Sequence, residues 1–236
     1  MLVAAAVCPC PPVLVPEVAS GAAPELDGLR AAALDAIGLL AAARPDRLVV
    51  VGPADEAGRG AYEQGSAGSF RGFGVDLDVR LGAAATTPER PLPPSLSVGA
   101  WLLARTDWAD APVEGLGVGE PLAPDRCVQA GRDIAASAER VALLVMGDGS
   151  ACRTVKAPGY YDERAEDFDA AVGRALGAAD TEALTGLDAE LAEELKASGR
   201  SSWQVLAGAA QDAGLHGALL CEEAPYGVGY FVAAWS

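Results

Sequence analysis

An apolar hexapeptide runs directly into a glycine-rich turn at Arg140-Val141-Ala142-Leu143-Leu144-Val145-Met146-Gly147-Asp148-Gly149-Ser150-Ala151. A short apolar run bounded by glycine is typical of a buried strand, so we expect residues 141–146 to form a central strand. The Gly-Asp-Gly-Ser segment then predicts a tight turn at the carboxyl end of that strand. Open α/β sheets bind ligands at this end, so Asp148 and Ser150 are candidates to orient a substrate or a metal-bound water. Alternatively, both side chains bond the backbone of a polar turn.

Strand and helix patterns alternate on both sides of this stretch. Further strands are expected at residues 1–7, 47–51, 75–81, 113–118, 219–222 and 230–234. Helices are expected at 24–44, 125–137, 162–176, 181–184 and 187–195. Ser95 is expected to cap a helix that carries Trp101, Leu102 and Leu103, and Ser201 or Ser202 to cap one that runs through Ala210. Loops are expected at 56–72 and 87–94. No repeat or linker divides the chain, so we expect residues 1–236 to form a single α/β domain, with a central mixed, largely parallel sheet flanked by helices.

Composition excludes several classes of protein. The chain has 236 residues, of which 51% are hydrophobic, and 17 Lys and Arg oppose 33 Asp and Glu, giving a net charge of -16. Such a charge repels phosphate backbones and anionic membrane surfaces, so we expect neither nucleic acid nor membrane as a partner. No stretch approaches the roughly 20 apolar residues that span a bilayer. Five cysteines without a CxxC pair favour a reducing compartment, and we expect a cytoplasmic protein.

Five segments, in order along nearly the whole chain, give this sequence a specific resemblance. It resembles the B-subunit-like family of class III extradiol ring-cleavage dioxygenases, whose relatives include the Memo-type proteins. The matching segments are Cys10-Pro11-Pro12-Val13-Leu14-Val15-Pro16-Glu17; Val50-Val51-Gly52-Pro53; Gly147-Asp148-Gly149-Ser150 with Gly159-Tyr160 and Phe168-Asp169; Gly199-Arg200-Ser201-Ser202-Trp203; and Ala224-Pro225-Tyr226-Gly227-Val228-Gly229-Tyr230.

The resemblance implies a non-haem Fe(II) held by two histidines and one carboxylate, which leaves positions open for catecholate and dioxygen. This sequence departs from that pattern. Cys10 and Ala54 stand where the resemblance places the ligand histidines, and Ala151 stands in place of the acid/base histidine. The third ligand falls near residues 198–202, where neither Glu nor Cys occurs. The only histidine, His216, cannot build a two-histidine site within one chain, and no G-x-S-x-G motif pairs it with a nucleophilic serine.

The cysteines offer an alternative metal site. Cys8 and Cys10, with Cys221 and either Glu222 or Glu223, supply thiolate and carboxylate ligands that suit Zn better than Fe(II). Against this, buried cysteines commonly act as small hydrophobic residues. The carboxylates between Asp162 and Asp169 are expected on the solvated face of a helix.

We therefore expect a degenerate class III extradiol dioxygenase B-subunit-like protein, without Fe(II) or ring cleavage, that keeps a cleft for a small molecule or a protein partner. On this interpretation the chain is a pseudoenzyme and needs no cofactor. The alternative is an active dioxygenase-like oxidoreductase with a rewired Fe or Zn site. A purely structural or assembly role is a third alternative, and a homo-oligomer is compatible with all three. The expected cleft residues are Cys10, Pro53, Ala54, Asp55, Asp148, Ser150, Ala151, Tyr160 and Ser198.

Overall fold

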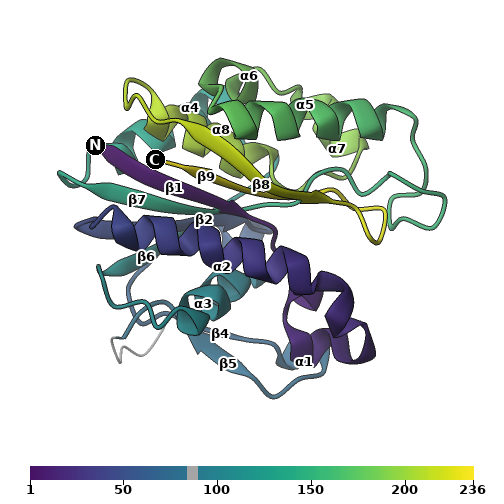
Figure 1. The fold of residues 1–236 in the computed structure, drawn as a ribbon, viewed down its shortest axis with the longest axis horizontal. Helices are drawn as coiled ribbons and strands as arrows, with labels where there is room; N and C mark the ends of the chain where they lie inside the picture. The colour runs from purple at the N-terminus through teal and green to yellow at the C-terminus, as the bar shows by residue number, and fades with distance from the viewer. Residues whose placement is uncertain (84–89) are drawn as a thin grey trace.

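Strand β7 (Val141–Met146) lies in the middle of a seven-stranded sheet, which confirms the central strand expected from the sequence. The computed structural model describes residues 1–83 and 90–236. All six residues of β7 are buried, because the strand has a neighbour on each side and helices over both faces. The strand order is β3-β6-β2-β7-β1-β9-β8 (Figure 1).

The sheet is mixed and mostly parallel. Strands β6 (Val113–Val118), β2 (Arg47–Pro53), β7 and β1 (Leu2–Cys8) run parallel to one another. Strands β3 (Gly60–Tyr62), β9 (Tyr230–Trp235) and β8 (Gly217–Glu223) are antiparallel to their neighbours. The carboxyl ends of β1, β2, β6 and β7 therefore meet at one edge of the domain.

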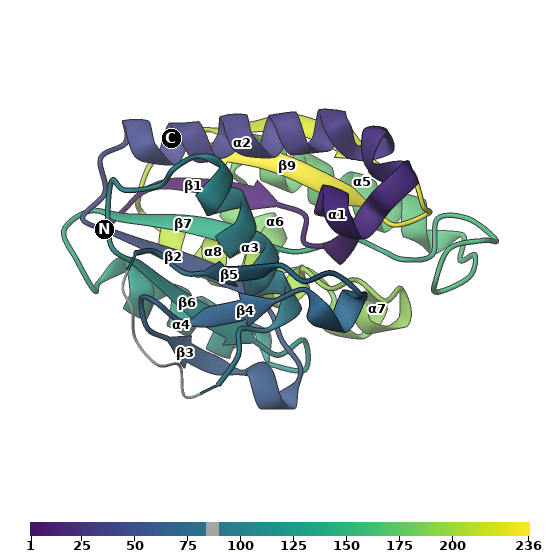
Figure 2. The same cartoon turned by 90° about the horizontal axis from the view of Figure 1, so that it is seen from below.

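Helices cover both faces of the sheet and form a three-layer α/β domain (Figures 1 and 2). Alternate residues of β1 point to opposite faces: Ala4, Ala6 and Cys8 join one core cluster, and Ala5 and Val7 join the other. Helices α2 (Asp27–Ala42) and α3 (Pro94–Arg105) pack in the first cluster. The second contains residues of α4 (Pro124–Ala135), α5 (Arg164–Ala178), α6 (Thr181–Thr185), α7 (Ala189–Glu194) and α8 (Arg200–Ala210).

Shorter elements complete the chain. Strands β4 (Ala67–Ser69) and β5 (Asp78–Arg80) form a separate two-stranded sheet. Helix α1 (Pro16–Ala19) is one turn long, and 3-10 turns cover Pro12–Leu14, Ser20–Leu26, Glu56–Gly58 and Arg71–Phe73. Within the described part of the chain, no helix is both long and apolar enough to cross a membrane.

Several local predictions were wrong. The loop expected at 56–72 contains β3 and β4, whose three residues each are too few to show a strand pattern, and the strand expected at 75–81 shortens to β5. Ser95 lies inside α3, where its Oγ donates to the Pro53 carbonyl at 2.6 Å instead of capping the helix. Helix α8 begins at Arg200 after Gly199, so Ser201 and Ser202 are interior residues and not caps. Residues 87–89 of the connection expected at 87–94 lie outside the described residues.

Candidate functional site

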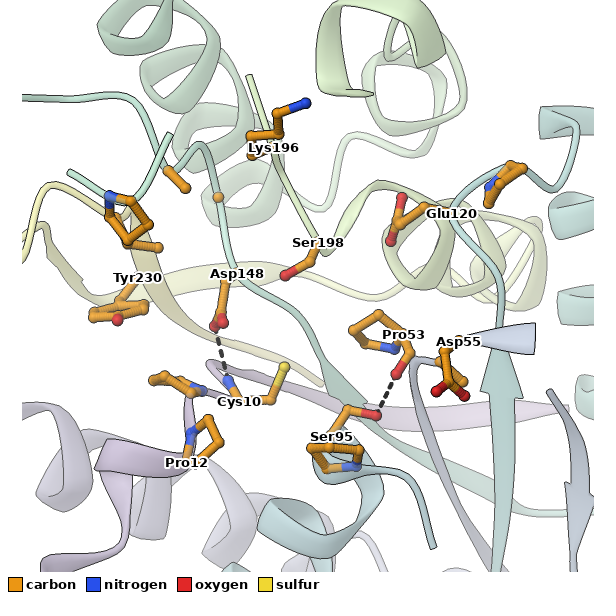
Figure 3. A pocket seen from close by; sticks show the side chains of 18 of the residues that line it. Cys10, Pro12, Pro53, Asp55, Ser95, Glu120, Asp148, Lys196, Ser198 and Tyr230 are labelled. Carbon is orange, nitrogen blue, oxygen red and sulfur yellow. Dashed lines mark hydrogen bonds between the residues drawn. The ribbon is translucent and has the colours of Figure 1, made fainter. Parts of the chain in front are cut away.

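A pocket of about 720 Å³ opens where the parallel strands end, at the edge of the sheet where α/β proteins bind ligands. It collects residues that follow β1, β2, β6 and β7, together with the segment before α8 (Figure 3). Several residues expected in the cleft contribute to its lining, namely Cys10, Pro53, Ala54, Asp55, Asp148, Ala151 and Ser198.

Backbone contacts fix Asp148 beside Cys10 and Ser198. The Gly147 amide donates to the Cys8 carbonyl at 3.0 Å, which carries the parallel pairing of β1 and β7 past the strand ends. The Cys10 amide then donates to Asp148 Oδ1 at 2.8 Å (Figure 3). Asp148 and Ser198 form an isolated antiparallel bridge, with the Ser198 amide donating to the Asp148 carbonyl at 3.0 Å. The segment before α8 is thereby tied to the turn after β7.

Three ionisable groups at the floor of the pocket, those of Asp148, Cys10 and Tyr230, have raised pKa values, which favours their protonated forms. Burial raises the pKa of Asp148 from 3.8 to about 7, although the hydrogen bonds from Cys10 lower it. Burial also raises the pKa of the Cys10 thiol well above 9.0, and the negative charge of Asp148 adds to the effect. The pKa of Tyr230 is raised mainly by burial. Near neutral pH the floor therefore holds a thiol, a phenol and a carboxyl group that exchanges its proton.

Glu120 is a pocket residue that our sequence analysis missed. It follows β6 by two residues and accepts a hydrogen bond from Ser201 Oγ at 2.9 Å, while its Oε2 lies 3.7 Å from Arg200 Nε. Burial raises the pKa of Glu120, and Ser201 and Arg200 lower it. The strand-end rule that selected Asp55 and Asp148 also applies at residue 120 and would have found this carboxylate.

Two cations at the pocket were also missed. Arg59 and Lys196 line it, and among the described residues neither side chain forms a hydrogen bond or an ion pair. No local sequence signal marks them, because Arg59 lies in a glycine-rich connection and Lys196 follows a short helix.

Ser150 and Tyr160 do not belong to the pocket, which corrects the expectation for both. Ser150 is fully buried, and both its amide and its Oγ donate to the carboxylate of Asp169 at 2.8 Å. Asp169 itself is fully buried, contrary to the expected solvated helix face, because this turn and Arg153 supply its hydrogen-bond donors. Tyr160 is 76% exposed and lies outside the pocket lining.

The alternative site of Cys8, Cys10, Cys221 and Glu222 does not assemble. Cys221 lies on β8, which β9 separates from β1, so about 10 Å of sheet lies between Cys221 and Cys8, whereas Zn–S bonds are about 2.3 Å long. Throughout residues 1–83 and 90–236, no group of three or more His, Cys, Asp and Glu side chains is arranged to hold a metal ion. Cys8 is fully buried in the core, where it packs as a small apolar side chain.

The pocket also does not fit the Fe(II) centre that the resemblance implies. Cys10, Ala54 and Ser198 offer no imidazole and no carboxylate at the matched positions. His216 exchanges backbone hydrogen bonds with Ser236 just before β8, at the end of the sheet opposite the pocket. A site of two histidines and one carboxylate is therefore not available to one chain.

Comparisons with known proteins add a likeness of fold only. No protein-family model matches the chain, and no curated protein sequence matches it. Its structure is similar to the crystal structure of the uncharacterized protein JW3007 from Escherichia coli K12, with a TM-score of 0.49 and 16% sequence identity over 99% of each chain. A likeness at this level carries no information about activity.

Proposed function

We propose that this protein is a degenerate class III extradiol dioxygenase B-subunit-like protein, without Fe(II) or ring cleavage, that binds a small molecule in the pocket at the strand ends. The observation that carries the proposal is the common lining formed by Cys10, Ala54, Ala151 and Ser198. These residues come from four separate segments, and the resemblance places the metal ligands and the acid/base histidine at or near them. Their convergence supports the alignment, and their chemistry argues against Fe(II).

The shape of the pocket favours a small molecule over a protein partner. Its volume of about 720 Å³ lies within the range of about 300–1,000 Å³ that is typical of small-ligand sites. Much of the pocket lining is apolar, including Val228 and the ring of Tyr230. Six prolines also line it, namely Pro11, Pro12, Pro53, Pro94, Pro121 and Pro158. We therefore expect a ligand with an apolar body.

The charges of the pocket favour an anionic ligand. Each of the three carboxylates among the described lining residues accepts a hydrogen bond from the protein: Asp148 from the Cys10 amide, Glu120 from Ser201 and Asp55 from the Gly58 amide. The cations described above have no such partner within the described residues. Arg59 and Lys196 are exposed at the pocket, so both side chains can turn towards a small organic anion.

A matched pair of probes tests this proposal. We expect 3-phenylpropionate to bind in saturation-transfer NMR and 2-phenylethylamine, which has a similar body and the opposite charge, not to bind. Ala151→Trp places an indole in the pocket and should abolish the signal. Ala178→Trp, at an exposed position on α5, is the control and should bind like the wild type.

Two results contradict the proposal. Equal binding of 3-phenylpropionate by Ala151→Trp and wild type would show that the acid does not bind in this pocket. Dioxygen uptake with catechol by protein that retains stoichiometric iron would establish the active metalloenzyme instead.

A further inference from the structure

A second pocket, which we call the side pocket, adjoins the main pocket at the end of β6. It has a volume of about 320 Å³ and is lined by Leu116, Gly117, Val118, Gly119, Leu122 and Ala130, together with Arg59 and Pro121. Arg59 and Pro121 also line the main pocket. Pro121 directly follows Glu120, which lies with Asp55 on the side of the main pocket away from Tyr230 (Figure 3). The two pockets therefore form one site with two chambers that meet at this side.

The side pocket is apolar. Arg59 is the only charged side chain among the described residues that line it. Leu116 of β6 and Ala130 of α4 pack against the core on that face of the sheet, and Leu122 is 36% exposed. Because apolar surface is stabilised when it leaves water, we expect this chamber to accept an apolar group and not a second charge.

The wall between the two chambers has a fixed backbone. The Ala54 amide donates to the Val118 carbonyl at 2.8 Å, which ties β6 to the end of β2. Arg200 Nη1 donates to the Leu122 carbonyl at 2.7 Å from the buried start of α8. The segment from Val118 to Leu122 is therefore held at both ends, so both chambers are formed before a ligand binds.

The guanidinium of Arg59 lies on this wall, against the backbone of Gly119. A Cβ atom at residue 119 would lie 2.8 Å from Arg59 Cζ, so only glycine leaves room for the arginine here. The backbone of Arg59 is also held, because Arg90 Nη1 donates to its carbonyl at 2.6 Å. The exposed guanidinium has no hydrogen-bond or ion-pair partner in residues 1–83 and 90–236. A cation therefore lies at the boundary, with a chamber on each side.

From this arrangement we infer that the ligand is an α-branched carboxylic acid, which places one apolar group in the main pocket and a second one in the side pocket. The inference rests on the proposed function, because it takes a small organic anion in the main pocket as its starting point. A carboxylate held by Arg59 at the boundary faces both chambers. Branching at the carbon next to the carboxylate directs one apolar group into each, whereas an unbranched acid leaves one chamber in contact with water.

Calorimetric titration with two isomeric acids tests the side pocket. 2-Butyl-3-phenylpropionate carries its butyl group at the branch, and 3-(4-butylphenyl)propionate carries it on the ring, so the two have the same composition and charge. Because burial of each methylene is worth about fourfold in affinity, we expect the branched acid to bind at least about tenfold more tightly than 3-phenylpropionate.

A variant on α4 shows where the butyl group binds. Ala130→Phe fills the side pocket and should remove the gain of the branched acid. Its affinities for 3-phenylpropionate and for the ring-substituted isomer should remain within about twofold of wild type, as for a change outside the main pocket. Gln129→Phe adds the same ring at the adjacent exposed position of α4, outside both chambers, and should keep the gain. Circular dichroism of each variant checks that the fold is retained.

Nuclear Overhauser contacts in the wild type locate the butyl group without any variant. We expect contacts from the butyl chain to the methyl groups of Leu116 and Leu122. Contacts only to Val228 and Tyr230 of the main pocket would overturn the inference, and so would a branched acid that binds no more tightly than 3-phenylpropionate or a gain that survives in Ala130→Phe. Each of these results leaves the proposed function intact. If the wild type binds neither acid, the proposed function fails together with the inference.

Discussion

Asp148 accepts a hydrogen bond from the backbone amide of Cys10 at 2.8 Å, across the carboxyl ends of the neighbouring parallel strands β7 and β1. The bond holds this partly buried carboxyl group at the pocket. Desolvation raises the pKa of Asp148 to about 7, so its proton exchanges near neutral pH. Where the resemblance implies a metal centre, this protein has an ionisable acid and a protonated thiol.

The raised pKa of Asp148 predicts a pH-dependent stability. The folded protein holds this proton up to about pH 7, whereas the unfolded chain releases it near 3.8. The stabilisation is therefore complete below pH 3.8 and is lost as the pH rises through about 7, and it amounts to at most about 4 kcal/mol. The side chain of Asp148→Asn can still accept the hydrogen bond from the Cys10 amide, and it carries no charge. Urea unfolding should therefore find this variant more stable than wild type at pH 8.

The control for this experiment is a variant that removes a carboxylate outside the pocket. Asp167→Asn removes an exposed carboxylate on α5 and should leave the pH dependence as in wild type. If wild type and Asp148→Asn lose stability in parallel between pH 5 and pH 8, Asp148 does not titrate in the manner described.

The affinity for an anionic ligand should depend on whether Asp148 is protonated. A carboxylate ligand is repelled by ionised Asp148 and accepted by the neutral acid, so the affinity for 3-phenylpropionate should rise several-fold as the pH falls from 8 to 6. Cys10, Tyr230 and Glu120 also face this region, and their pKa values are raised as well. Calorimetric titration of Asp148→Asn should give an affinity with little pH dependence. A wild-type affinity that falls towards pH 6 would contradict this assignment.

The cations at the pocket should contribute to anion binding. Arg59→Gln and Lys196→Gln each remove one exposed positive charge, and each should weaken 3-phenylpropionate binding about fourfold, because an exposed ion pair contributes less than about 1 kcal/mol. Arg126→Gln removes an exposed cation on α4 outside the pocket and should leave the affinity within twofold of wild type. If all three variants bind alike, the selectivity for anions does not arise from these residues.

Asp169 should be essential for stability. Its carboxylate is fully buried, bonds the amide and hydroxyl of Ser150, and lies 3.2 Å from Arg153 Nη1. Asp169→Ala leaves these donors without an acceptor and should lower the free energy of unfolding by about 3 kcal/mol in urea denaturation. Glu166→Ala removes the exposed partner of the same arginine and should cost less than about 0.5 kcal/mol. Equal losses would show that Asp169 is not the anchor of this turn.

Sequence patterns predicted the central architecture because its strands have strong local signals. The apolar run at 141–146 is bounded by glycine and forms the central strand, and the run at 47–51 forms most of β2. The short strands β3 and β4 were missed because pairing with β6 and β5 defines them, not their own composition. Ser95 has the residue type of a helix cap, but its hydroxyl bonds the end of β2.

Part of the pocket lining was predicted because the strands that end at the pocket have strong local sequence signals. Residues that follow parallel strands, such as Cys10, Ala54 and Asp148, are brought together by the topology, and strand ends can be read from the sequence. The direction of a side chain cannot be read in this way. Ser150 lies two residues after Asp148 yet turns into the core, because Asp169 lies on a helix that only the tertiary fold brings close. That Arg59 and Lys196 have no hydrogen-bond or ion-pair partner among residues 1–83 and 90–236 likewise depends on packing.

We propose that this pocket binds its ligand without a metal. Elemental analysis of freshly purified protein by plasma mass spectrometry, beside a Cys8→Ser/Cys10→Ser variant, tests it most directly. We predict that neither sample contains stoichiometric iron or zinc. One equivalent of either metal in the wild type that is lost in the variant would contradict the account and establish a cysteine-ligated metal site.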